Sequence, residues 1–139
     1  MALTTSVEQV AGRVPITIVS LEGELDASNF ERFVDDVRGL YDAGTRHLLL
    51  DLTGLTFLAS SGLVALSSIV RIMHGEPPID PEAGWGALHE LGHDVSGGAT
   101  QAEVQLAGTQ PAVERVLQRT GLDRLFRIHP DRGTAIEAF

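Results

Sequence analysis

Three consecutive leucines, Leu48–Leu50, constrain the fold of this 139-residue chain more than any other feature. Successive side chains of a strand point to opposite faces of its sheet. An unbroken apolar run therefore predicts a short strand that is buried on both faces, as is typical of parallel sheets covered by helices. Asp51 follows the run and is expected near the C-terminal end of this strand.

The segment before Leu48 predicts a hairpin and a helix. Residues from about Ser6 to Leu21 include two β-branched stretches separated by a turn, which indicates two strands. Apolar residues from Phe30 to Tyr41 recur at spacings of three and four, which predicts a helix that ends at Gly44. Ser28 and Glu31 have the spacing of a capping box at the start of that helix.

The segment after the strand predicts a second helix. Beyond a turn, apolar residues from Leu63 to Met73 keep the helical period. Ser60 or Ser61 is expected to cap the N-terminus of this helix, because serine is a preferred cap residue.

The C-terminal part predicts a further strand, helix, strand and short helix. Pro111 suits the first position of the helix, and Gly121 suits the position after its last turn. The full predicted order is β-β-α-β-α-(insert)-β-α-β-α. This alternation predicts an α/β fold with a mixed, mostly parallel sheet of about four or five strands. We expect a single domain over residues 1–139.

The stretch at about 75–101 predicts a surface insert. It holds three of the six prolines of the chain and several glycines, which favour irregular structure. Its tryptophan, Trp85, is a candidate anchor for a partner protein or for a second copy of the chain in a weak homodimer.

Residues 89–93 of the insert read HELGH and match the H-E-x-x-H pattern of zinc peptidases. On a helix, His89 and His93 would hold the metal and Glu90 would act as the general base. A catalytic zinc needs a third protein ligand, and the positions where the extended motif places Gly and His hold Ser and Ala here. We therefore expect no resident metal or other cofactor, and only adventitious metal binding by His89 and His93.

The charge balance excludes several classes of partner. The chain has 10 Lys and Arg against 19 Asp and Glu, a formal net charge of −9. Nucleic acids and anionic membranes need clustered basic residues, so neither is an expected ligand. The lack of cysteines, of a secretory signal and of a long apolar stretch predicts a cytoplasmic protein.

Serine hydrolase chemistry has little support. A triad of Ser60, His47 and Asp51 can be written, but the sequence has no G-x-S-x-G elbow. A triad is defined by geometry, which composition alone does not supply. We predict that the chain is not an enzyme.

Three stretches resemble the STAS domain, and most of all the bacterial anti-sigma factor antagonists. They are GELD at Gly23–Asp26, LLLDLTGLTFLASSGLVAL at Leu48–Leu66, and PAVERVLQRTGLDRLFRI at Pro111–Ile128. Their order and spacing match the family, and from Gly23 to Ile128 they span most of the chain outside the insert. The resemblance implies a sheet with helices packed mainly on one side.

The resemblance also implies a function. Family members of this branch are regulators that bind an anti-sigma factor, which is also a serine kinase, and let go once phosphorylated. The family's phosphoacceptor position corresponds to Ser60, with Ser61 as second choice. The candidate partner-binding residues are Asp26, Ala59, Ser60, Ser61, Gly62 and Leu63.

Ala59 departs from the family pattern, which usually has Asp before the acceptor serine. We therefore predict a protein that binds a kinase-type anti-sigma factor but is a poor substrate for it. The alternative within the family is a STAS scaffold module of a larger sensory complex, with Ser60 unmodified.

Overall fold

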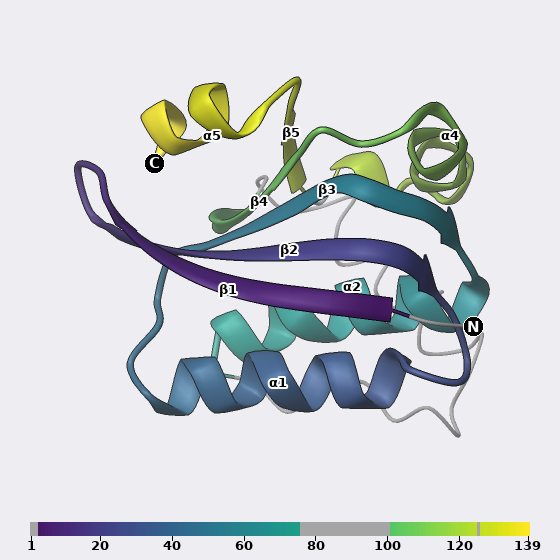
Figure 1. The fold of residues 1–139 in the computed structure, drawn as a ribbon, viewed down its shortest axis with the longest axis horizontal. Coiled ribbons are helices and arrows are strands. Elements are labelled where there is room, and N and C mark those ends of the chain that lie inside the picture. The colour runs from purple at the N-terminus through teal and green to yellow at the C-terminus, as the bar shows by residue number, and fades with distance from the viewer. Residues whose placement is uncertain (1–2, 76–100, 125) are drawn as a thin grey trace.

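The computed structural model describes residues 3–75, 101–124 and 126–139, and its strands form one mixed sheet (Figure 1). The strand order is β1-β2-β3-β4-β5. The first two strands form an antiparallel hairpin, and the remaining neighbours are parallel. The strands are β1 (Leu3–Ala11), β2 (Pro15–Leu25), β3 (Leu48–Leu58), β4 (Gln101–Ala107) and β5 (Phe126–His129).

Helices cover both faces of this sheet unequally. Figure 1 shows α1 and α2 beneath one face and α5 on the opposite side. Residues of α4 join the same apolar cluster as α1 and α2, so the helices pack mainly on one side. The predicted α/β fold and element order are confirmed. The helical segments are α1 (Phe30–Asp42), α2 (Ser60–Met73), α4 (Pro111–Thr120), the 3-10 helix η2 (Leu122–Arg124) and α5 (Arg132–Ala138).

The three leucines of β3 divide between two cores. Leu48 and Leu50 lie in the main apolar cluster with α1, α2 and α4. Leu49 points the other way, into a smaller cluster with Ala135 of α5. All three side chains are fully buried, which confirms the two-sided strand. Truncation of Leu50 to alanine would cost about 2–5 kcal/mol, the usual range for a fully buried leucine.

β3 is longer than the sequence predicts. The turn expected after the leucine run is absent, and the strand continues through Gly54 to Leu58. A Cβ at Gly54 would come within 2.6 Å of the Glu22 side chain, so glycine permits the close approach of β2 there. The prediction that Asp51 ends the strand is wrong, because Asp51 is followed by seven more strand residues.

The start of α1 also differs from the prediction. The N-cap residue is Asn29, and the helix begins at Phe30, so Ser28 does not hold the expected cap position. The Oδ1 of Asn29 instead accepts a hydrogen bond from the Asp26 N–H at 3.0 Å, and its Nδ2 donates to the Glu24 carbonyl at 2.9 Å. The predicted end is confirmed, because Gly44 follows the helix with a φ of 116°.

Residues 76–100, which make up nearly all of the insert predicted at about 75–101, lie outside the described residues. The interpretations of Trp85, His89, Glu90 and His93 fall in this stretch. Within the described part of the chain, no group of three His, Asp or Glu side chains could hold a metal ion. No helix of that part is long and apolar enough to cross a membrane.

Candidate functional site

The C-terminal ends of β2 and β3 meet at one edge of the sheet. Leu25 and Leu58, the last residues of the two strands, are register partners. The Ala59 N–H donates to the Leu25 carbonyl at 3.0 Å, which extends the pairing by one step. Segments that follow neighbouring parallel strands emerge at the same edge, where open α/β sheets bind their ligands. Asp26 and Ala59 therefore leave the sheet side by side.

Asp26 is locked in a local turn directly after β2. Its Oδ1 accepts hydrogen bonds from the Ser28 hydroxyl at 2.5 Å and the Ser28 N–H at 2.9 Å. These hydrogen bonds from Ser28 lower the pKa of Asp26 below its usual value, so the carboxylate is charged at neutral pH. Strand β2 ends at Leu25, so Asp26 is the first residue after it.

The start of α2 lacks a side-chain cap. The N-cap residue is Ala59, in an extended conformation, and its methyl group cannot accept a hydrogen bond. Ser60 and Ser61 occupy the first two helical positions, so the prediction that one of them caps the helix is wrong. The first backbone bond here runs from the Leu63 N–H to the Ala59 carbonyl at 3.1 Å. The three helical N–H groups that precede it have no partner within the helix, as at any helix start.

Gly62 lets α2 begin close to the sheet. A Cβ at this position would lie 2.6 Å from the Leu58 side chain and 3.0 Å from the Leu25 carbonyl oxygen. Any other residue would push the first turn of α2 away from the ends of β2 and β3. The glycine of the Ala59–Gly62 stretch therefore fixes where the two serines stand.

The candidate residues divide into exposed and buried ones. Ser60 is exposed, and Ala59 and Ser61 are partly buried. Gly62 and Leu63 are buried, with Leu63 inside the main apolar cluster. The exposed group can touch a partner directly, whereas the buried pair can act only by holding the exposed group in place.

Phe57 is an exposed residue of this edge that the sequence analysis missed. Its side chain is 50% exposed, although it stands near the end of the core strand β3. The pairing shifts between Gly23–Leu55 and Glu24–Phe57, which leaves Thr56 as an extra residue in a bulge. A bulge re-aims the side chains around it. The signal available in the sequence was the spacing of Leu55 and Leu58, which are three residues apart and so break the period of two expected of a strand.

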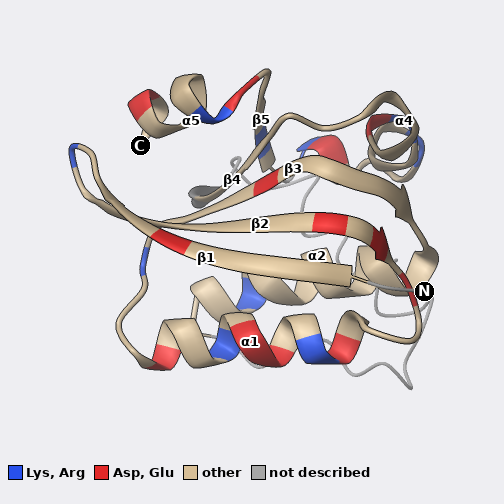
Figure 2. Ribbon diagram, in the orientation of Figure 1, with Lys and Arg blue, Asp and Glu red and all other residues tan. Residues whose placement is uncertain are grey.

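We give one name, the Ser60 edge, to the exposed and partly buried residues at this end of the sheet that a partner could contact. Figure 2 shows acidic positions near the end of β2 and none at the start of α2. The only charged residue of α2 is Arg71, in its last turn. The positive end of the helix dipole is therefore the main source of positive potential at the first turn. The Ser60 edge consists of Asp26, Phe57, Ala59, Ser60 and Ser61.

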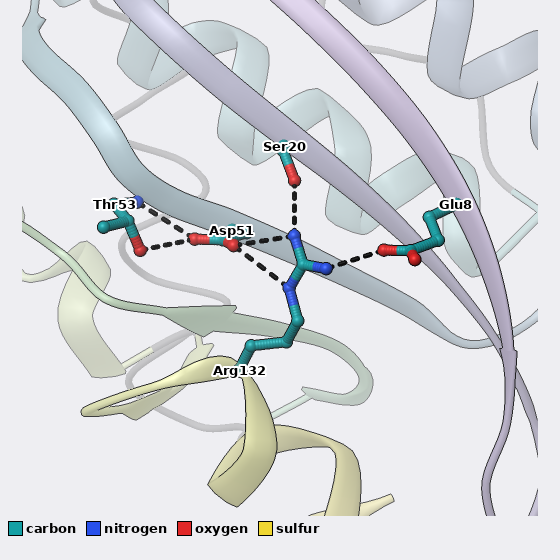
Figure 3. Close-up of polar contacts among 5 residues, drawn as sticks. All are labelled: Glu8, Ser20, Asp51, Thr53 and Arg132. Atoms are coloured by element: carbon teal, nitrogen blue, oxygen red, sulfur yellow. Dashed lines mark hydrogen bonds and ion pairs between the residues drawn. The ribbon is translucent and has the colours of Figure 1, made fainter.

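A second polar cluster lies around Arg132, on the face of the sheet that carries α5 (Figure 3). The Arg132 guanidinium contacts Asp51 Oδ2 at 3.0 Å and 3.2 Å, Glu8 Oε2 at 2.6 Å and Ser20 Oγ at 2.9 Å. It thereby ties α5 to the first three strands. We name this cluster the Arg132 clamp. The clamp consists of Glu8, Ser20, Asp51, Thr53 and Arg132.

Asp51 is the most buried charge of the clamp, with its side chain 13% exposed. Burial alone would raise the pKa of Asp51, but hydrogen bonds from Thr53 and the Arg132 guanidinium outweigh it, so the pKa is lowered. Thr53 contributes both its hydroxyl, at 2.6 Å, and its N–H, at 3.1 Å. The carboxylate is thus held charged and fully engaged.

These positions exclude the hydrolase triad. The Asp51 carboxylate is engaged by Arg132 and Thr53, and the His47 ring packs edge-on against Phe139 at 5.9 Å. His47 precedes β3 and Ser60 follows it, so the length of an 11-residue strand separates them. At about 3.3 Å per residue that distance is roughly 35 Å, far beyond hydrogen-bond reach.

Several solved structures share this fold. An anti-sigma factor antagonist from Mycobacterium paratuberculosis matches with a TM-score of 0.69 and 22% identity, over 99% of this chain and 93% of that one. A candidate anti-sigma factor antagonist from Thermotoga maritima also has a TM-score of 0.69 and 22% identity, over 96% and 92% of the two chains.

The anti-sigma factor antagonist SpoIIAA matches in two states. Its unphosphorylated form has a TM-score of 0.66 and 19% identity, over 96% of this chain and 94% of that one. Its phosphorylated form, from Bacillus, has a TM-score of 0.55 and 18% identity, over 96% and 97%. At these identities the likeness concerns the fold. The family model of the STAS domain matches residues 8–74 and 82–135, and the chain therefore belongs to the STAS domain family.

Proposed function

We propose that this chain is a regulator that acts by binding an anti-sigma factor through the Ser60 edge. The observation that carries the proposal is an exposed serine at the first position of an uncapped helix, close in sequence to the half-exposed Phe57. Aromatic side chains are frequent anchors of protein interfaces. Anti-sigma factor antagonists share the fold, and SpoIIAA shares it in a phosphorylated form.

The proposed release step is phosphorylation of Ser60 by the partner, acting as a serine kinase. The Ser60 Oγ bonds to the γ-phosphorus of ATP, the bond to the β–γ bridging oxygen breaks, and ADP leaves. The hydroxyl proton passes to a base of the kinase. The product adds a charge of about −2 at the surface that the partner covers.

Local electrostatics favour a switch that leaves the fold intact. The uncapped N–H groups and the dipole of α2 would accommodate the phosphate on the protein itself. The end of β2 carries acidic residues, and α2 has no basic residue before Arg71, so the remaining charge of the phosphate faces the partner. Binding then weakens by like-charge repulsion and by the desolvation of the phosphate.

Ala59 sets the expected rate of this step. An aspartate at the N-cap would fix the first turn of α2 and present a carboxylate beside the acceptor hydroxyl. The methyl group of Ala59 does neither, so we expect slow phosphorylation together with intact binding. The same observation favours the second candidate function, a STAS scaffold module whose Ser60 is never modified.

Affinity capture from the source cell tests the binding role. The tagged full chain should retain a kinase-type anti-sigma factor, identified by mass spectrometry. A Phe57→Ala variant should lose it. A Val7→Ala variant should retain it, because Val7, at 54%, is the other exposed large apolar side chain among the described residues. Equal capture by both variants would refute the role of Phe57, and capture of a multiprotein assembly without such a kinase would favour the scaffold.

Intact-mass measurement with the captured kinase and ATP tests the switch. The wild-type chain should gain one phosphate slowly, and Ala59→Asp should gain it faster. Ser60→Ala should gain none, whereas Ser61→Ala should behave like the wild type. Rapid and complete modification of the wild type would contradict the role given to Ala59.

A further inference from the structure

Strand β1 forms the outer edge of the sheet, and α1 lies beneath it (Figure 1); two hollows are lined by residues of this region. One hollow of about 250 Å³ is lined by residues of β1, β2 and α1, and a neighbouring hollow of about 460 Å³ shares three of them. No residue of the Ser60 edge lines either of them. The two hollows together are named the β1 groove. Its lining includes Thr5, Val7, Val19, Phe33, Asp36 and Leu40.

The backbone of β1 offers hydrogen bonds to this groove. β1 is the first strand of the sheet order, so within the described residues its outer side has no neighbouring strand. Its register with β2 runs unbroken from Leu3 to Ala11, without a bulge. An edge of this kind presents a row of unpaired N–H and C=O groups that can accept another strand.

β1 also lacks the devices that usually block an edge. It contains no Pro or Lys, and its one charged residue, Glu8, pairs with Arg132 on the α5 face. Val7 lies on the α1 face, because its register partner Val19 belongs to the main cluster, and it is 54% exposed. An edge strand without these devices is a pairing site.

The charges around the groove select its occupant. Helix α1 carries four acidic residues and two arginines, and one of the arginines, Arg32, lines only the larger hollow. Asp36 lines both hollows, and its side chain makes no ion pair or hydrogen bond within the described part of the chain. A second copy of the chain would bring the same acidic helix and a formal charge of −9 against it. A strand with a basic side chain has the complementary charge.

We propose that the β1 groove binds an extended segment of a partner protein, which adds to the sheet beside β1. Its backbone pairs with the free edge, an apolar side chain packs beside Val7, and a Lys or Arg reaches Asp36. This recognition mode is β-augmentation, in which backbone bonds give affinity and alternate side chains give specificity. It concerns a surface other than the one proposed for the anti-sigma factor.

Two synthetic peptides test the proposal on the isotope-labelled full chain by NMR. The probe is the capped nonapeptide TVTKTVTVT, and its matched control has Glu in place of Lys. The Lys peptide should shift the amide signals of β1 and of the middle of α1, and bind about threefold or more tightly than the Glu peptide, as expected for one exposed ion pair. Added salt should reduce this preference.

Matched variants test whether the peptide binds at the β1 groove or elsewhere on β1 and α1. Val7→Lys should weaken binding of the Lys peptide, whereas Ser6→Lys, which adds the same charge on the other face of β1, should not. Asp36→Asn should remove the preference for Lys over Glu, whereas Asp35→Asn should keep it. Equal binding of the two peptides, shifts outside β1 and α1, or no shift at millimolar peptide would overturn the proposal. A chain that doubles its mass through β1 without peptide would also overturn it, in favour of a second copy.

Discussion

The Arg132 clamp and the Ser60 edge differ in how far their polar groups are hydrogen-bonded within the chain, although β3 contributes to both. In the clamp, each guanidinium nitrogen of Arg132 meets an oxygen, and both oxygens of Asp51 accept hydrogen bonds. At the Ser60 edge, the first turn of α2 begins on an alanine with no side-chain cap. Helix ends that are left without internal partners are open to external ones.

The two regions use their polar groups for different purposes. The clamp joins segments that are 81 residues apart in sequence, so its hydrogen bonds serve the tertiary fold. The Ser60 edge leaves a helix N-terminus and an aromatic side chain exposed at the expense of some stability. Variants that weaken the clamp or complete the cap therefore test the comparison directly.

The largest expected effect comes from filling the space at Gly62. Gly62→Val should lower the free energy of unfolding by about 3 kcal/mol, because its Cβ overlaps Leu58 and the Leu25 carbonyl. Urea unfolding followed by circular dichroism measures the loss. Gly39→Ala is the control, since nothing lies within 4 Å of its Cβ. It should stabilise the helix by about 1 kcal/mol. Equal stability of the wild type and Gly62→Val would show that the Ser60 edge is loosely packed.

Loss of the clamp should have the next largest effect. Arg132→Met should lower the free energy of unfolding by about 2 kcal/mol, because Asp51 keeps its charge without the guanidinium and the Arg132 side chain is itself partly exposed. Arg13→Met, at an exposed position in the β1–β2 turn, should change it by less than about 0.5 kcal/mol. An equally small change in the free energy of unfolding for Arg132→Met and Arg13→Met would mean that the clamp does not stabilise the fold, and the contrast with the Ser60 edge would be lost.

The contribution of the clamp to the free energy of unfolding should depend on pH. The pKa of Asp51 is lower in the folded chain than the unfolded value of about 3.9. A group with a lowered folded pKa stabilises the fold above its unfolded pKa, and this contribution is lost as the pH falls through the folded pKa. The stability gap between the wild type and Arg132→Met should be constant from about pH 5 to 7 and narrow below about pH 4. Urea midpoints across this range measure it, and a gap that widens in acid would contradict the assignment.

The smallest expected effect is a gain at the Ser60 edge. Ala59→Asp should raise the free energy of unfolding by about 1 kcal/mol, because its carboxylate can accept from the free N–H groups of α2. Ala59→Asn should give a similar gain without the charge, which separates capping from the helix dipole. Thermal unfolding measures both. No gain from either variant would mean that the α2 N-terminus is already satisfied.

The apolar periodicity of the sequence predicted the type of each helix and strand better than it predicted where they begin and end. The apolar period of α1 and the leucines of β3 were sufficient for type and burial, because periodicity reports directly on which faces are covered. Both predicted N-caps were wrong. Asn29 and Ala59 hold the cap positions, because the strand ends at Leu25 and Leu58 decide where each helix can start.

The candidate site was predicted in part. The family resemblance led to Asp26 and the Ala59–Leu63 stretch, and the register of β2 with β3 places the first beside the start of the second. Phe57 was missed, because a bulge that depends on the neighbouring strand turns it outward. Phosphorylation of Ser60 and the role of the insert stay predictions.

The sequence by itself determined the order of strands and helices, the two-sided burial of β3 and the family, since each of these follows from local periodicity or from contiguous motifs. Only the tertiary structure decided the Arg132 clamp, the exposure of Phe57 and the free edge of β1. Each of these depends on which segments become neighbours once the sheet has formed. Hydrogen bonding and burial between distant segments leave no periodic trace in the sequence of either one.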